Sequence, residues 1–228
     1  MRKILILGGN SDIGISLINK LIKEKYNLHV HYNKKFVKTK LISKIKLIKQ
    51  DLSKINSKNL NNIFDKDYDI IINLVGYVSN QSFLQFDIQE IQKTILINSL
   101  IPFLIIRQSI KNMVKKKYGR IINTSSVGVK FGGGSKTFSY SLSKHINEFI
   151  PGDIRKISSN NILYNVLRIG VTNTKFHKKI KNKSLRQRLK LIPLKKMAKV
   201  SDISNYINFL ISDNNFITNE IINITGGE

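Results

Sequence analysis

The sequence predicts one doubly wound α/β domain, in which helices cover both faces of a mainly parallel sheet of about seven strands. Three observations lead to this prediction. Short apolar runs alternate with amphipathic stretches along all 228 residues, which is the pattern of strands and helices that follow each other in turn. Several runs are apolar at consecutive positions, as is typical of strands buried on both faces. No repeat, Ser/Pro-rich linker or break in composition divides residues 1–228, so a single domain is expected.

Each element is predicted from its own pattern. Apolar runs predict strands at Lys3–Leu7, Leu28–Tyr32, Lys46–Ile48, Asp69–Leu74, Arg120–Thr124, Leu163–Arg168 and Glu220–Ile224. Apolar residues at helical spacing predict helices at Ile13–Lys25, Ile91–Lys116, Tyr140–Lys156 and Asp202–Ser212. Pro151 and Gly152 fall inside the third of these helices, and a proline there is expected to kink or end it.

The composition excludes several classes of protein. With 41% hydrophobic residues the chain is not intrinsically disordered. No run of 18 apolar residues and no signal-peptide pattern is present, so we expect a cytoplasmic protein without a membrane span. The chain has no cysteine, and its four histidines lack metal-ligand spacing, so no metal site is expected.

The net charge of +25 first suggests a nucleic-acid or anionic-membrane partner. However, the chain contains 32 Lys, 39 Ile and 25 Asn, and these residues share A/T-rich codons. A biased genome therefore explains most of the excess charge. No helix-turn-helix, RRM or OB signature is present, so we expect no nucleic-acid partner.

A glycine turn (residues 7–14) joins the first predicted strand to the first helix. Glycine permits a tight turn at Gly8 and close packing at Gly14. The start of a helix presents free backbone N–H groups and a positive dipole end, which favour a pyrophosphate. Asp12 is expected to cap this helix. A plain strand–helix turn fits the same residues, but the context favours a dinucleotide site whose candidate residues are Gly8, Asn10, Ser11, Asp12, Ile13 and Gly14.

Tyr140 and Lys144 lie four positions apart in a predicted helix, so their side chains share one face. The charge of Lys144 would favour the phenolate and lower the pKa of Tyr140, as a general acid/base near neutral pH requires. Taken alone, the pair also fits a solvated helix face. Likewise, Ser125 and Ser126 fit a turn after a strand, and Asn98 fits a hydrogen-bonded core residue.

Together these motifs resemble those of the short-chain dehydrogenase/reductase family, which has a compact Rossmann fold. The glycine turn is similar to TGxxxGIG, with Leu7 at the Thr and Asp12 at the middle Gly, and Tyr140 and Lys144 form YxxxK. The resemblance runs from Leu5 to Gly227 in the same order and spacing. The other matching segments are 119–126 (the strand ending in the catalytic serine), 73–76 (NNAG), 165–174 (NxxxPGxxxT, with Ile169 in place of Pro) and 221–227.

The resemblance implies hydride transfer between a nicotinamide cofactor and a carbonyl substrate. It gives Ser126, or Ser125 in the other register, the role of orienting the carbonyl oxygen. Tyr140 would donate the proton, Lys144 would bind the nicotinamide ribose, and Asn98 would hold a relay water. The remaining cofactor contacts that it implies are Asp51, Leu52, Asn73, Val75, Gly76, Gly170, Thr172 and Thr174, together with Tyr140 and Lys144.

The end of the second predicted strand indicates the cofactor. An enzyme that selects NAD usually has an acidic residue there, which binds the ribose hydroxyls. This chain has none, and Asn33, Lys34 and Lys35 follow the strand instead. Lysine is abundant throughout, so the missing acid is the stronger indication. We expect NADP(H) in preference to NAD(H), with Asn33 and Lys34 at the 2′-phosphate.

The segment from Lys175 to Lys199 contains 11 Lys or Arg and no acidic residue. The resemblance implies that residues 175–193 form a variable substrate lid. The charge indicates an anionic or carrier-bound substrate, such as a 3-oxoacyl thioester or a keto-sugar or polysaccharide precursor, although a solvated basic helix also fits. A non-catalytic NADP-binding sensor or regulator is the alternative function. The resemblance also implies a homodimer or homotetramer, although Pro151 and Gly152 interrupt a helix of the usual contact.

Overall fold

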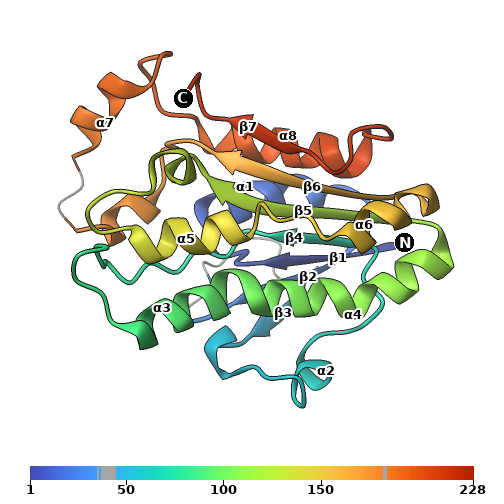
Figure 1. Ribbon diagram of the computed structural model, residues 1–228. Helices are drawn as coiled ribbons and strands as arrows, with labels where there is room; N and C mark the ends of the chain where they lie inside the picture. The colour runs from blue at the N-terminus through green and yellow to red at the C-terminus, as the bar shows by residue number, and fades with distance from the viewer. Residues whose placement is uncertain (35, 37–44, 182–183) are drawn as a thin grey trace.

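A seven-stranded sheet forms the centre of the structure, in which every pair of neighbouring strands is parallel (Figure 1). This computed structural model describes residues 1–34, 36, 45–181 and 184–228. The strand order is β3-β2-β1-β4-β5-β6-β7. The strands are β1 (Arg2–Leu7), β2 (Tyr26–Tyr32), β3 (Ile45–Lys49), β4 (Ile70–Asn73), β5 (Gly119–Ser126), β6 (Ile162–Ile169) and β7 (Ile221–Ile224).

Helices cover both faces of the sheet, with α3, α4 and α5 on one face and α1 and α8 on the other (Figure 1). The α-helices are α1 (Asp12–Leu21), α2 (Leu60–Ile63), α3 (Ile88–Ile95), α4 (Ile101–Lys116), α5 (Phe138–Ile146), α6 (Gly152–Lys156), α7 (Leu185–Leu191) and α8 (Val200–Ser212). The strand order reverses between β1 and β4. In such sheets ligands bind at this point, beyond the carboxyl ends of the strands.

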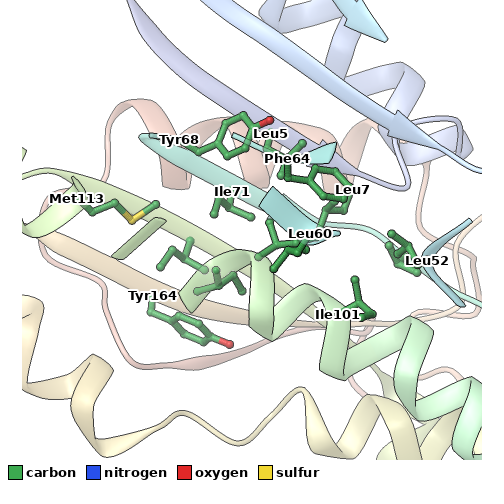
Figure 2. Close-up of a cluster of buried hydrophobic side chains, with 14 of the residues drawn as sticks. Leu5, Leu7, Leu52, Leu60, Phe64, Tyr68, Ile71, Ile101, Met113 and Tyr164 are labelled. Carbon is green, nitrogen blue, oxygen red and sulfur yellow. The ribbon is translucent and has the colours of Figure 1, made fainter. Parts of the chain in front are cut away.

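Alternate residues of β1, β3, β4, β5 and β6 enter two separate apolar clusters. Leu5 and Ile71 face α4 and belong to the cluster drawn in Figure 2, whereas Ile4 and Ile70 face α1 and α8. Side chains alternate across a strand, and both faces of this sheet are covered. The strands are therefore apolar at consecutive positions, as the sequence predicts.

The seven strands confirm the predicted strands, but the helices differ from prediction in several places, and α2 was not predicted. Helix α1 ends at Leu21 rather than Lys25. The long helix begins at Ile88 and contains a π-helical turn, Leu96–Leu100, between α3 and α4. The predicted helix Tyr140–Lys156 is two helices, because α5 already ends at Ile146 and α6 begins at Gly152. A residue before proline disfavours the helical conformation, so the chain cannot stay helical through Ile150 into Pro151.

The continuous helix from Ile88 to Lys116 is 29 residues long. Within the described part of the chain it is the one helix long and apolar enough, by length and composition, to cross a membrane. Half of its most apolar window is buried inside the protein. Its buried residues pack on the sheet in the cluster of Figure 2, which is the position of a core helix.

Candidate active site

A cavity of about 1550 Å³ lies at the carboxyl ends of the strands. Its walls come from the glycine turn, the ends of β4, β5 and β6, helix α5 and the lid. Most of the predicted site residues line it: Gly8, Asn10, Ser11, Asp12, Ile13, Asn33, Lys34, Leu52, Val75, Gly76, Ser126, Tyr140, Lys144, Gly170, Thr172 and Thr174. Gly14, Asp51, Asn73 and Asn98 are not among the lining residues and lie behind these walls. Lys35 lies outside the described residues.

In the glycine turn, backbone segments pack directly against each other, Gly8 against Leu74 and Gly14 against Gly9. Gly8 has φ +70°, and a Cβ atom there would lie 2.9 Å from the carbonyl oxygen of Leu74. A Cβ atom at Gly14 would lie 2.4 Å from the carbonyl oxygen of Gly9. The first N–H groups of α1 have no intrahelical acceptor, and Ser11, Asp12 and Ile13 at the start of this helix line the cavity. The residues present therefore fit a pyrophosphate group.

The residue that caps α1 is Ser11, whereas the sequence predicts Asp12. The Gly14 N–H donates to Ser11 Oγ at 3.1 Å. Asp12 is the first residue of the helix, and its Oδ2 accepts a hydrogen bond of 2.6 Å from the Lys175 N–H at the start of the lid. The cap prediction was wrong because Ser11 already supplies the oxygen at the capping position. Asp12 links the glycine turn to the lid instead.

Lys144 is buried, and its ammonium group is surrounded by oxygen atoms. Its Nζ donates to the carbonyl oxygens of Val75 at 2.8 Å and Thr124 at 3.0 Å, and to Thr124 Oγ1 at 3.2 Å. Burial lowers the pKa of Lys144 to about 7. The side chain therefore lies close to its titration midpoint at neutral pH, which suits a group that exchanges protons there.

Tyr140 is half-buried and lines the cavity next to Lys144, whose Nζ is 5.9 Å from the centre of the phenol ring. Burial raises the pKa of Tyr140 to about 12, although the nearby Ser126 hydroxyl opposes the rise. The structure therefore does not show the lowered pKa that the sequence predicts. Lys144 directs its Nζ at the oxygens of Val75 and Thr124 rather than at the phenol, and burial favours the neutral phenol.

The two serines at the end of β5 face different surroundings. Ser125 Oγ donates to Glu148 Oε1 at 2.7 Å, and the same carboxylate accepts from Arg168 Nε and Nη2, each at 2.7 Å. Ser126 lines the cavity, its Oγ accepts from the Gly128 N–H at 3.2 Å, and its hydroxyl is close enough to Tyr140 to influence the pKa of the phenol. The sequence left open whether Ser125 or Ser126 lies at the site. In the structure it is the hydroxyl of Ser126 that lies beside Tyr140.

Asn98 lies in the π-helical turn and is completely buried. Its Oδ1 accepts from the Tyr77 N–H at 2.7 Å, and its Nδ2 donates to the Tyr77 carbonyl at 2.9 Å and to Ser143 Oγ at 2.9 Å. The side chain thus holds the chain after β4 against α5. It is a fully hydrogen-bonded core residue in this structure.

Asn147 also belongs to this network, although the sequence analysis did not select it. Its Nδ2 donates to the carbonyl oxygens of Asn98 and Thr124, each at 3.1 Å, and Lys144 Nζ contacts the same Thr124 oxygen. Asn147 therefore connects Asn98 to Lys144. The available signal was its spacing, since it follows Tyr140 and Lys144 on the same helix face.

Two further predicted residues support the walls from behind. Asn73 Nδ2 donates to Asn123 Oδ1 at 2.8 Å, and its Oδ1 accepts from the Val75 N–H at 3.1 Å. Asp51 accepts from Ser53 N–H at 3.0 Å and from Ser53 Oγ at 2.8 Å, and so caps the short turn containing Leu52. Both side chains are thereby directed at protein groups, and they shape the cavity through Val75 and Leu52.

Part of the segment predicted to form the lid, residues 175–193, lines the cavity beside Tyr140. The ring of Phe176 lies 5.3 Å from that of Tyr140, centre to centre. Asn80 donates from Nδ2 to the Lys179 carbonyl at 2.9 Å and accepts from the Lys181 N–H at 2.8 Å. Arg188 in α7 forms an ion pair with Glu228. The lid therefore contacts the glycine turn, the chain after β4 and the segment after β7. Residues 182 and 183 lie outside the described residues.

The sequence is similar to those of known proteins. A family model described as enoyl-(acyl carrier protein) reductase matches residues 49–228. The chain is 25% identical over 185 residues to the 3-oxoacyl-(acyl-carrier-protein) reductase FabG of Aquifex aeolicus, covering 78% of this chain and 74% of that protein.

Solved structures have the same fold. A 4-hydroxyisoleucine dehydrogenase complexed with NADH superimposes with a TM-score of 0.84 at 27% identity, covering all of this chain and 98% of that one. ElxO with NADP bound superimposes with a TM-score of 0.83 at 23% identity, covering 99% and 98%.

Proposed function

The chain belongs to the short-chain dehydrogenase/reductase family of oxidoreductases, and we propose that it is an NADP(H)-dependent reductase of a ketone carbonyl. The substrate class proposed is a 3-oxoacyl thioester, for which the similarity to FabG argues, or else a keto-sugar or polysaccharide precursor. One observation carries the proposal. The side chains of Ser126, Tyr140 and Lys144 meet in the cavity that the glycine turn also lines.

The protein side of the proposed reaction follows from these three residues. A bound nicotinamide cofactor supplies the hydride. Ser126 Oγ holds the carbonyl oxygen and favours the negative charge that develops on it. Tyr140 then donates its phenolic proton to that oxygen. A phenol whose pKa is about 12 stays protonated at neutral pH and gives its proton only to a stronger base. Lys144, with a pKa of about 7, returns a proton to this pair.

The proposed cofactor contacts follow the cavity walls. In this proposal the glycine turn faces the pyrophosphate and Lys144 faces the nicotinamide ribose. The adenine lies against Leu52 and the residues behind it. Asn33 and Lys34 are exposed at the cavity edge after β2, where no acidic residue follows the strand. The proposal further places the protein in the cytoplasm as a homodimer or homotetramer. Exposed apolar side chains at Leu100 and Phe149, 46% and 69% accessible, are available for such contacts.

A substrate panel tests the proposed function. Purified protein is mixed with 3-oxoacyl thioesters, keto-sugars and simple ketones, and oxidation of NADPH or NADH is followed by absorbance. We expect turnover of a 3-oxoacyl thioester with NADPH and slower turnover with NADH. Binding of NADPH without turnover of any carbonyl would instead favour the alternative, a non-catalytic NADP-binding sensor or regulator.

Replacing Lys34 with Asp is expected to change the cofactor preference. The new carboxylate would repel a 2′-phosphate and accept hydrogen bonds from ribose hydroxyls. We expect the ratio of kcat/KM for NADPH to that for NADH to fall by about tenfold or more, as for the loss of one charge-assisted contact. Lys58→Asp is the control, since Lys58 is exposed outside the cavity and the change in net charge is the same. Equal ratios in the two variants would contradict the assignment of Lys34.

The basic lid is expected to make catalysis sensitive to salt. Lys175, Lys179 and Lys181 line the cavity, whereas Arg188 is paired with Glu228. At about 0.1 M salt, charges that are more than roughly 10 Å apart are largely screened from each other. Salt therefore weakens the attraction between these lysines and an anionic substrate. We expect kcat/KM for a coenzyme A thioester to fall several-fold between about 0.05 and 0.5 M salt, and that for a neutral ketone to change little. The same salt dependence for both substrates would contradict a steering role for the lid.

A further inference from the structure

The imidazole of His31 lies between the glycine turn and the segment after β3. Its Nδ1 is 3.2 Å from the backbone nitrogen of Gly8, and its Nε2 is 2.9 Å from the carbonyl oxygen of Gln50. The backbone carbonyl of His31 also accepts from the Gly9 N–H at 2.9 Å. One residue of β2 therefore binds the N–H groups of both Gly8 and Gly9 in the glycine turn. It does so from a buried position, since 3% of His31 is accessible.

These contacts determine the protonation state of the ring. The Gly8 N–H is only a donor, so Nδ1 must accept and carry no proton. The Gln50 carbonyl is only an acceptor, so Nε2 carries the proton. Burial lowers the pKa of His31 against the opposing effects of the Gln50 carbonyl and the Asp51 carboxylate. The neutral imidazole with its proton on Nε2 is thus the form that completes both hydrogen bonds.

The turn and β2 fit tightly at this place. A Cβ atom at Gly9 would lie 2.4 Å from the Val30 side chain, so the turn lies directly on the strand. Gly8 adopts a left-handed conformation, φ +70°, and its N–H group points at Nδ1. A buried N–H that loses its acceptor costs free energy unless the backbone turns away. The geometry of the turn therefore depends on the acceptor at Nδ1.

We propose that His31 is a positioning residue for the dinucleotide, whose neutral Nδ1 holds Gly8 and thereby keeps the glycine turn in the conformation that receives the pyrophosphate. This inference rests on the proposed cofactor site. His31 lines the cavity beside the turn, and the role proposed for it acts through the backbone of Gly8. Its side chain therefore contributes to affinity by organising the free protein.

Three substitutions of His31 separate this role from simple packing. In His31→Asn the amide Oδ1 can accept from Gly8, since it branches from Cγ as Nδ1 does. In His31→Gln the polar atoms lie one bond further out, beside Gln50 rather than Gly8. In His31→Leu no acceptor remains. His29→Leu is the matched control: His29 is buried on the same strand and binds the Tyr68 hydroxyl at 3.0 Å, with no contact to the turn.

The measurements are the Kd for NADP⁺ by titration calorimetry and the Tm of each free variant. We expect Kd to rise about tenfold in His31→Leu and His31→Gln, in line with an unsatisfied buried N–H, and to stay within about threefold in His31→Asn and His29→Leu. We expect Tm to fall in both His29→Leu and His31→Leu, but Kd, of these two variants, to rise only in His31→Leu. The loss of cofactor affinity is then distinguished from a loss of stability.

Equal Kd values for His31→Leu and His29→Leu, or a Kd for His31→Asn as weak as that of His31→Leu, would overturn the inference. If the unaltered protein itself bound neither NADP⁺ nor NAD⁺, the proposed cofactor site would fail instead.

Discussion

Replacing Tyr140 with Phe is expected to lower kcat by about three orders of magnitude, within the range that general acid catalysis contributes. The ring and its contact with Phe176 remain, but the proton donor to the developing oxyanion is lost. The Kd for NADPH, measured by fluorescence titration, is expected to change by less than about threefold, because no charge is removed.

Tyr77→Phe is the matched control for this prediction. Tyr77 also lines the cavity, but its hydroxyl donates to Glu90 Oε2 at 2.7 Å, away from Ser126 and Lys144. This variant should retain most of the turnover of the unaltered protein. Full turnover in Tyr140→Phe would remove the tyrosine from the proposed mechanism, whereas loss of turnover in both variants would indicate a structural effect.

Replacing Ser126 with Ala is expected to lower kcat by about a hundredfold or more, as for the loss of one hydrogen-bond donor to a developing oxyanion. The same substitution at Ser125 should leave kcat within about threefold and lower stability instead. Ser125 binds the Glu148 carboxylate, which Arg168 also holds, and removing one hydrogen bond from a charged group costs about 1.5–3 kcal/mol.

Steady-state kinetics and chemical denaturation of both serine variants provide the test. Each change removes a single oxygen from adjacent residues of β5, so the pair is closely matched. If Ser125→Ala lost turnover and Ser126→Ala kept it, the register that the structure supports would be wrong.

The strands could be read from the sequence because their patterns depend on burial alone. A parallel sheet covered on both faces needs apolar residues at consecutive positions, and runs such as Ile70–Asn73 show this directly. Helix ends were less predictable. Pro151 indicated a break, but α5 ends earlier, at Ile146, since Asn147 turns its amide toward the carbonyls of Asn98 and Thr124.

The candidate site was predictable where its chemistry resides in local spacing. Tyr140 and Lys144 share a helix face at four-residue spacing, and a glycine turn between a strand and a helix is a local feature. The pKa values of the site residues could not be predicted in the same way. Lys144 was expected to lower the pKa of Tyr140, yet burial raises it to about 12, since the oxygens of Val75 and Thr124 hold the ammonium group.

The doubly wound sheet, the order of its elements, the position of the glycine turn and the candidate catalytic residues could all be predicted from the sequence alone. The three-dimensional packing was needed to show that Ser126 rather than Ser125 lines the cavity with Tyr140, and that Ser11 rather than Asp12 caps α1. It was also needed to find the contacts of His31 with Gly8 and of Asn147 with Asn98 and Thr124. The physical reason is the range of the interactions. Burial patterns and helix faces repeat within a few residues of the sequence. By contrast, the Lys144 Nζ binds the carbonyl oxygen of Val75, which is 69 residues away in the sequence, and the Gly8 N–H binds His31, which is 23 residues away.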